Sequence, residues 1–203
     1  MTGPQTLTIM ESNALLDVFL KDTGTLKHKR KSARNYLMGL LMLDAGLRVS
    51  ETVQLLITDL WLNGEPRHSL QVREGIAKYK AGRVIPLSTR IQAATKVHYV
   101  RNWVLLAEPT SGFAFYKELS NNHLTDRQAE RIIGQAAEKA IGRWVHPHIL
   151  RHTAASRWMR TCNARVVQDL LGHKHLSSTQ IYTHPNADDK RKALALSRRK
   201  LDR

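Results

Sequence analysis

The spacing of apolar residues predicts helices at both ends of the chain, with a strand-rich segment between them. Thr8 and Glu11 have the spacing of a capping box, and the apolar residues that follow, as far as Leu20, predict a first helix. Residues 35–45 are apolar and numerous enough for a buried helix, and Gly46 is placed to end it. The N-terminal quarter is therefore expected to contain two helices.

Alternation of apolar and polar residues replaces the helical spacing in the middle of the chain. Asn63-Gly64 is a strong turn signal, and residues 69–73 and 83–87 alternate in the manner of short strands. Residues 75–82, between those two segments, have the composition of a basic hairpin tip. Short strands are therefore expected in this part of the chain.

Helical spacing returns after the second of these strands. Residues 91–106 predict an amphipathic helix, and residues 125–141 predict another, which begins with a capping-box pattern and ends at Gly142. Residues 113–116 form a short apolar segment that we expect to be extended. Residues 186–203 predict a charged helical tail at the C-terminus.

The balance of charged residues indicates that the protein binds a polyanionic partner. Lysine and arginine number 32 against 17 aspartate and glutamate residues, for a formal net charge of +15. Such an excess most often marks a nucleic-acid-binding protein. The apolar share of 42% favours a packed globule over a basic tail, and 203 residues suffice for one well-cored domain.

Cysteine content and hydropathy indicate the compartment. The single cysteine, Cys162, excludes an internal disulfide and suits a reducing cytoplasm. No apolar run approaches the roughly 18 residues that a membrane span needs. The N-terminus lacks a basic segment followed by an apolar core, so no secretory signal is expected. We expect a soluble, cytoplasmic protein.

One run of basic residues lies between the first two expected helices. Residues 27–31 read Lys-His-Lys-Arg-Lys. The run is polar enough to be a solvated surface loop, and its charge equally suits a contact with phosphates. Both interpretations stay open from the sequence.

The residues with the most chemical potential lie near the C-terminus. His148 and Arg151 form an H-x-x-R motif, Leu171-Gly-His173 follows, and Tyr182 lies nine residues further on. One interpretation places a guanidinium, two imidazoles and a phenol around a single phosphate. A zinc site is the alternative, since His148 and His152 are spaced four apart. The lack of an H-E-x-x-H motif and the position of Arg151 between these histidines argue against zinc.

Arg48 lies just past the expected buried helix and before a new helix start. A guanidinium at such a point can be held rigidly while its donors stay available. The alternative is an ordinary surface ion pair between Arg48 and Glu51, worth a few tenths of a kcal/mol.

The order and spacing of these motifs resemble the tyrosine recombinases, the phage-integrase family. H-x-x-R, L-G-H and the tyrosine resemble its C-terminal signature, and Gly46-Leu-Arg48-Val-Ser-Glu51 resembles its first arginine box. The resemblance implies an α+β, mainly α fold with a small three-stranded antiparallel sheet. It implies one catalytic domain over residues 1–203, without an N-terminal core-binding domain and similar in size to the recombinases that invert fimbrial genes.

The resemblance also implies a reaction. Tyr182 would attack a DNA phosphodiester, forming a 3′-phosphotyrosyl link and freeing a 5′ hydroxyl that rejoins another strand. Neither ATP, a metal ion nor any other cofactor is required, provided that the protein supplies the positive charge. Integration, excision and inversion are all outcomes of this chemistry.

Roles for the other motif residues follow from the resemblance. Arg48 and Arg151 would neutralise the charge on the phosphate, and His148 would hydrogen-bond it or accept the tyrosine's proton. His173 would be presented to the same phosphate by the turn that follows Leu171-Gly172. Glu51 would support the arginines. The family carries a lysine on a β-hairpin that protonates the leaving oxygen, and ungapped counting places it at Lys78. Lys80 stays open as the alternative.

Double-stranded DNA is the partner implied, with a homotetramer on DNA and accessory proteins that set direction. The side chains expected to contact DNA are Lys27, Lys29, Arg30, Lys31, Lys80 and Arg83. Two other classes stay open: a type IB topoisomerase, which would use a similar residue set to relax DNA, and a DNA-binding module without catalysis.

Overall fold

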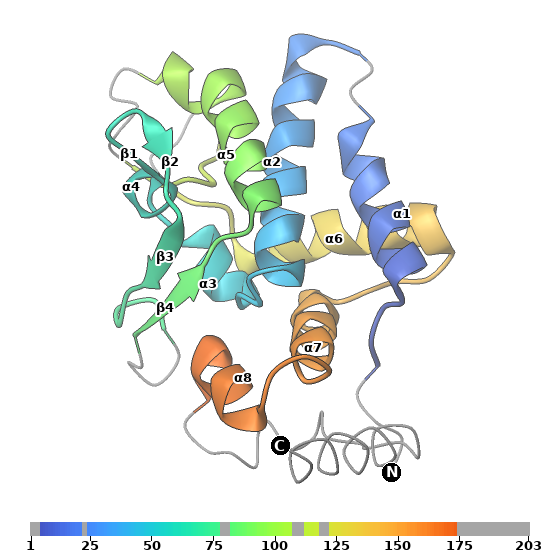
Figure 1. The fold of residues 1–203 in the computed structure, drawn as a ribbon. Helices are drawn as coiled ribbons and strands as arrows, with labels where there is room; N and C mark the ends of the chain where they lie inside the picture. The colour runs from blue at the N-terminus through green and yellow to red at the C-terminus, as the bar shows by residue number, and fades with distance from the viewer. Residues whose placement is uncertain (1–4, 22–23, 78–81, 107–111, 118–121, 174–203) are drawn as a thin grey trace, which may run out of the picture.

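The computed structural model describes residues 5–21, 24–77, 82–106, 112–117 and 122–173. These residues form a mainly helical α+β fold, as expected (Figure 1). The elements, in chain order, are α1 (Ile9–Leu20), α2 (Leu26–Leu43), α3 (Val49–Val53), α4 (Ile57–Leu60), β1 (Trp61–Leu62), β2 (Glu65–Pro66), β3 (Ser69–Val72), β4 (Arg83–Pro86), α5 (Thr89–Arg101), the 3₁₀ helix η2 (Trp103–Leu105), α6 (Asp126–Ile141), α7 (Pro147–Trp158) and α8 (Ala164–Leu171).

Helix α1 begins with the predicted capping box. The Thr8 hydroxyl accepts a hydrogen bond from the Glu11 backbone N–H at 3.1 Å, and the Glu11 carboxylate accepts one from the Thr8 N–H at 2.8 Å. The apolar face of α1 packs against α2 and α6. Its start is tied to α7, since the Leu7 N–H donates to the Thr153 hydroxyl at 2.9 Å.

Helix α2 lies at the centre of the fold, between α1 and α5 (Figure 1). Residues 37–43 are all buried, and Gly46, with φ of +62°, turns the chain after the helix ends. A Cβ at Gly46 would lie 2.7 Å from the Trp158 ring, so a larger residue does not fit there. The helix starts at Leu26, earlier than residue 35, where the sequence placed its beginning.

The basic run of residues 27–31 is therefore helical, and the expectation of a surface loop is wrong. Lysine and arginine are good helix formers, and the run contains neither glycine nor proline. The run forms the first turns of α2, and most of the buried residues lie in the second half of that helix.

The strands pair antiparallel, but within the described residues they form two two-stranded sheets instead of one three-stranded sheet. β1 pairs with β2 across the predicted Asn63-Gly64 turn, and β3 pairs with β4. Pro66 ends β2 and has no N–H to donate to a ladder. The Arg67 N–H bonds back to the Leu60 carbonyl at 2.9 Å, which continues the pairing of the first hairpin by one residue.

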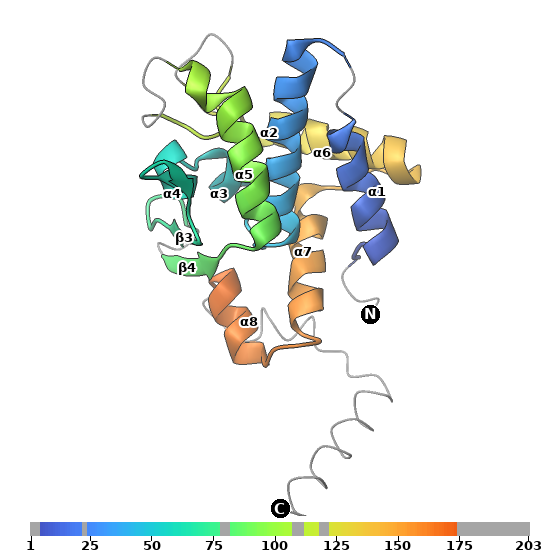
Figure 2. The ribbon, with the colours of Figure 1, turned by 45° about the horizontal axis from the view of Figure 1, so that its top comes forward.

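The second half of the chain supplies the remaining helices. The helix expected over residues 91–106 ends as α5 at Arg101, and the 3₁₀ helix η2 follows. Residues 113–116 make two isolated bridges, Leu56 with Phe113 and Tyr116 with His123. Helix α6 begins with the predicted capping box, and α8 packs against β4 and the end of α7 (Figure 2).

Two further sequence expectations bear on the fold. The tail over residues 186–203 lies outside the described residues. None of the helices in the described part of the chain is long and apolar enough to cross a membrane.

His98 on α5 is a titratable group inside the core. Its ring packs near those of Trp103 and Phe115, and one ring nitrogen lies 3.2 Å from the Ala114 carbonyl oxygen. Burial, with a smaller contribution from the nearby Arg34 charge, outweighs the opposing effect of that hydrogen bond and lowers the pKa of His98 from 6.5 to about 4. The folded protein therefore keeps this imidazole neutral.

We expect the fold to lose stability as the pH falls from 6.5 towards 4. The unfolded chain binds a proton at His98 in this window, whereas the folded chain does not. Stability is therefore undiminished above pH 6.5, where His98 is neutral in both states. At pH 5 the cost is roughly 2 kcal/mol. Urea unfolding of the wild type and of His98→Gln at pH 7.5, 6 and 5 measures it. An equal pH slope in both proteins contradicts the assignment.

Candidate active site

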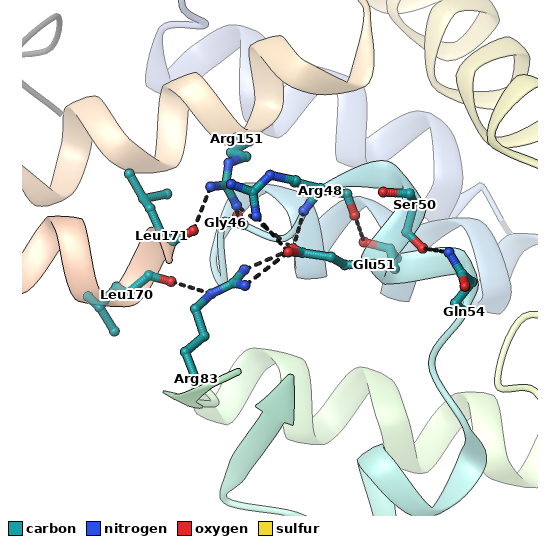
Figure 3. A network of polar contacts seen from close by, with 10 residues as sticks. Gly46, Arg48, Ser50, Glu51, Gln54, Arg83, Arg151, Leu170 and Leu171 are labelled. Atoms are coloured by element: carbon teal, nitrogen blue, oxygen red, sulfur yellow. Dashed lines mark hydrogen bonds and ion pairs between the residues drawn. The ribbon is translucent and has the colours of Figure 1, made fainter. Parts of the chain in front are cut away.

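Arginines from three distant segments surround one buried carboxylate, that of Glu51 on α3 (Figure 3). Arg48 donates to Glu51 Oε1 at 2.7 Å. The guanidinium fork of Arg83, at the start of β4, spans both carboxylate oxygens at 2.9 and 2.8 Å. Nη1 of Arg151, on α7, lies 3.8 Å from Glu51 Oε2. We call these four residues the Glu51 cluster.

The two arginines that the sequence assigned to phosphate binding thus lie together. Arg151 donates to the Gly46 carbonyl at 2.6 Å and to the Leu171 carbonyl at 2.7 Å. These bonds hold its guanidinium between the loop after α2 and the end of α8. The Arg48 side chain keeps 19% of its surface exposed, more than the side chains of Arg83 and Arg151. Arg48 therefore presents the most accessible guanidinium of the cluster.

The alternative of an Arg48–Glu51 surface pair is contradicted. The two side chains do form an ion pair, but the Glu51 side chain is fully buried. Glu51 also accepts a hydrogen bond from the Arg48 backbone N–H at 2.8 Å, which fixes the start of α3. A buried charge is strongly destabilising when it loses its partner. The Glu51 carboxylate therefore helps to hold the three nearby arginines in place.

The electrostatics keep Glu51 ionised. Burial alone would raise the pKa of its carboxyl, but the hydrogen bonds and charge of Arg83, the Arg48 N–H and the Arg48 charge outweigh burial and lower the pKa from 4.5 to about 2. At neutral pH the cluster therefore contains one negative charge and three positively charged guanidinium groups. The cluster keeps an excess of positive charge that a bound anion can neutralise.

His173 lies beside this cluster, directly after the end of α8. Gly172 ends the helix in the left-handed conformation, with φ of +61°, and the His173 N–H then bonds to the Gln168 carbonyl at 3.0 Å. Burial, followed by the charges of Arg151, Arg48, Arg83 and His152, lowers the pKa of His173 to about 4. The imidazole is neutral near pH 7, so one of its nitrogens can accept a proton or a hydrogen bond.

His148 lies on the same helix as Arg151 and is exposed. Its ring stacks on that of His146 at 5.6 Å and meets the edge of the His152 ring at 5.5 Å. Burial, then the charges of His148 and Arg151, lowers the pKa of His152. Among the described residues, no three histidine, cysteine or acidic side chains are grouped to hold a metal ion.

Arg83 does not occupy the DNA-facing place that the sequence suggested. Its side chain is only 3% exposed, and its three donor nitrogens bond to Glu51 and to the Leu170 carbonyl. The alternation of β4 gave a weak signal of this placement, since Arg83, Ile85 and Leu87 share one face and the latter two are core residues. The interior partner of Arg83 was not visible from the sequence.

The other expected site residues are not brought to the Glu51 cluster by the described structure. Residues 27–31 lie in the first turns of α2, and Gly46 follows its opposite end. Eighteen helical residues span roughly 27 Å, so this basic run is remote from Arg48. Lys78, Lys80 and Tyr182 lie outside the described residues.

Comparison with known proteins shows which family this chain resembles. The model of the phage integrase family matches residues 6–189. The tyrosine recombinase XerC of Azotobacter vinelandii (strain DJ / ATCC BAA-1303) is 31% identical over 189 residues, which cover 89% of this chain and 56% of that protein. The chain therefore spans little more than half the length of this relative.

Solved structures share the fold. The crystal structure of XerA recombinase matches with a TM-score of 0.74 and 26% identity, over 97% of this chain and 66% of that one. The XerH site-specific recombinase bound to a palindromic difH substrate, a post-cleavage complex, matches with a TM-score of 0.74 and 21% identity, over 98% of this chain and 54% of that one. The chain belongs to the phage integrase family, the family of tyrosine recombinases.

Proposed function

We propose that this chain carries out site-specific DNA recombination through a covalent 3′-phosphotyrosyl intermediate at Tyr182. The observation that carries the proposal is the Glu51 cluster, in which Arg48 and Arg151 lie around one buried carboxylate beside a neutral His173. This arrangement suits a phosphodiester, because two guanidinium groups can contact its non-bridging oxygens. Family membership supports the same chemistry.

The proposed reaction balances without a cofactor. The Tyr182 oxygen attacks the phosphorus, the bond to the 5′ oxygen breaks, and the phenolic proton passes to a base, for which His173 or His148 is suited. Lys78, with Lys80 as the alternative, donates a proton to the departing oxygen. Arg48 and Arg151 stabilise the charge of the five-coordinate transition state. Attack by a 5′ hydroxyl of another strand reverses these steps and rejoins the DNA.

The partner proposed is double-stranded DNA in the cytoplasm. The net charge of +15 supports it, and a protein of the same fold, XerH, has been solved with its DNA substrate. We propose that the chain acts as a homotetramer on two duplexes and that accessory proteins set the direction of exchange. The further phosphate contacts that we propose are Lys27, Lys29, Arg30, Lys31 and Lys80.

The test uses a nicked duplex that carries the DNA flanking the gene, from which a short fragment diffuses away after cleavage and so traps the intermediate. The wild-type protein is incubated with this DNA in the presence of a chelator, and the product is separated on a denaturing gel. We expect a covalent protein–DNA band, with the nucleotide attached to Tyr182 in the digested peptide.

Three other results would overturn the proposal. Attachment at another residue would exclude Tyr182 as the nucleophile. Relaxation of supercoiled DNA without any strand exchange between two duplexes would indicate a type IB topoisomerase. Tight DNA binding without a covalent band on flanking or supercoiled DNA would indicate a binding module.

A further inference from the structure

We propose that Arg83 is a positioning residue for DNA cleavage, which holds Glu51 and the end of α8 in the register that the phosphate-binding groups require. The inference rests on the proposed function, because it concerns the groups assigned to the phosphate. It adds to the motif residues a buried arginine that does not touch DNA and acts through its neighbours.

The contacts of Arg83 join segments that are far apart in the sequence. Its Nη1 and Nη2 atoms bind the two oxygens of Glu51, 32 residues earlier, and its Nε donates to the Leu170 carbonyl at 2.8 Å, 87 residues later. A guanidinium is planar and its donors are fixed in direction, so satisfying all three bonds fixes the distance between α3 and α8. Figure 3 shows Arg83 between these two elements.

The end of α8 is held by two arginines of the Glu51 cluster. Leu170 and Leu171 contribute successive carbonyl groups at the C-terminus of the helix, where carbonyls lack helical partners. Arg83 donates to the first carbonyl and Arg151 donates to the second at 2.7 Å. Both guanidinium groups also face Glu51. The place of α8 is therefore set by the same charges that would face the phosphate.

This link extends to His173. A Cβ built on Gly172 would lie 3.0 Å from Cδ of Arg83, so the chain crosses the arginine side chain closely on its way to His173. The Arg83 charge also contributes to keeping the His173 imidazole neutral. Loss of Arg83 would leave the Leu170 carbonyl unsatisfied and allow Glu51 to turn towards Arg48 and Arg151, which would shift the groups assigned to phosphate binding.

A change at Arg83 could also slow cleavage in a second way, through the nearby lysine, and the experiment must distinguish the two. Arg83 begins β4, five residues after Lys78, so its loss could act through the leaving-group acid instead of the cluster. A substrate with sulfur in place of the 5′ bridging oxygen separates the routes. A thiolate is a good leaving group without protonation, since an alkyl thiol such as that of cysteine has a pKa of about 8.5.

The test measures single-turnover cleavage of nicked duplexes with a bridging oxygen or a bridging sulfur, and DNA affinity separately. The variants are Arg83→Met, Arg83→Lys and Lys78→Ala, and the matched control is Arg90→Met. Arg90 also makes a bidentate pair with a carboxylate, that of Asp44 at 3.1 and 2.9 Å, but it lies at an exposed position on α5.

We expect Arg83→Met to cleave about 100-fold more slowly than wild type, as a misplacement of reacting groups by about 1 Å does, with DNA affinity little changed. The bridging sulfur should rescue Lys78→Ala but not Arg83→Met. Arg83→Lys keeps the charge and the fold but cannot span Glu51 and Leu170 together, so it should also be slow. The Arg90→Met control should cleave at the wild-type rate.

Several results would overturn the inference. Cleavage by Arg83→Lys at the wild-type rate would do so even if Arg83→Met failed to fold, as judged by its circular dichroism. Rescue of an Arg83 variant by sulfur would assign the effect to the leaving-group acid. A wild-type protein that forms no covalent complex on either substrate would instead overturn the proposed function. The two failures are therefore distinguishable.

Discussion

Replacement of Tyr182 by phenylalanine is expected to abolish the covalent protein–DNA complex and all strand exchange while leaving DNA binding intact. The change removes one oxygen atom, and no other atom of that side chain can attack phosphorus. The guanidinium groups of Arg48 and Arg151 are unchanged, so the electrostatic attraction to the phosphate remains. Denaturing gels on the nicked substrate, together with a binding titration, measure both effects.

The matched control for this variant is Tyr99→Phe. Tyr99 on α5 stacks on Trp61 with ring centroids 4.1 Å apart, and a phenylalanine ring can keep that contact. Its covalent band should match that of the wild type. A Tyr182→Phe protein that still forms a chelator-resistant covalent complex would exclude this residue as the nucleophile and with it the proposed mechanism.

Replacement of Glu51 by glutamine is expected to have the second largest effect, on stability as well as on cleavage. Glutamine keeps the shape of the side chain but removes the only negative charge among the three arginines of the Glu51 cluster. Loss of one partner from a buried ion pair, with a pKa lowered from 4.5 to about 2, corresponds to roughly 3 kcal/mol of unfolding free energy near pH 7.

The pH dependence of that loss has a defined direction. Because the folded pKa of Glu51 is lowered, its contribution is full above pH 4.5 and is lost as the pH falls towards 2. The difference between wild type and Glu51→Gln in urea unfolding should therefore shrink below pH 4.5. The control Asp44→Asn disrupts the exposed pair with Arg90 and should cost less than about 1 kcal/mol.

DNA should partly compensate for the loss of Glu51. A phosphate bound to Arg48 and Arg151 supplies the negative charge that the variant lacks, so DNA should raise the melting temperature of Glu51→Gln more than that of wild type. Cleavage should nevertheless be slower, since Arg83 loses the carboxylate that its fork spans. A variant as stable and as active as the wild type would contradict the organising role of Glu51.

Local patterns in the sequence predicted several of the helices, two of their N-terminal caps and the candidate chemistry. The capping boxes at Thr8 and Thr125 and the turn at Asn63-Gly64 depend on residues within a few positions of one another, so spacing alone predicts them. The motifs at Arg48 and Arg151 identified a family and hence a fold. The start of α2 was missed because basic residues carry no apolar periodicity even where they are helical.

Only the tertiary structure decided what surrounds these groups. Burial of Glu51, its pairing with Arg83 and the neutral state of His173 arise from contacts between segments that are far apart in the sequence. Whether an arginine side chain faces DNA or the protein interior depends on the partners that the fold places beside it. A one-dimensional pattern carries no information on such partners, because the energy of a buried charge is set by the whole of its three-dimensional surroundings.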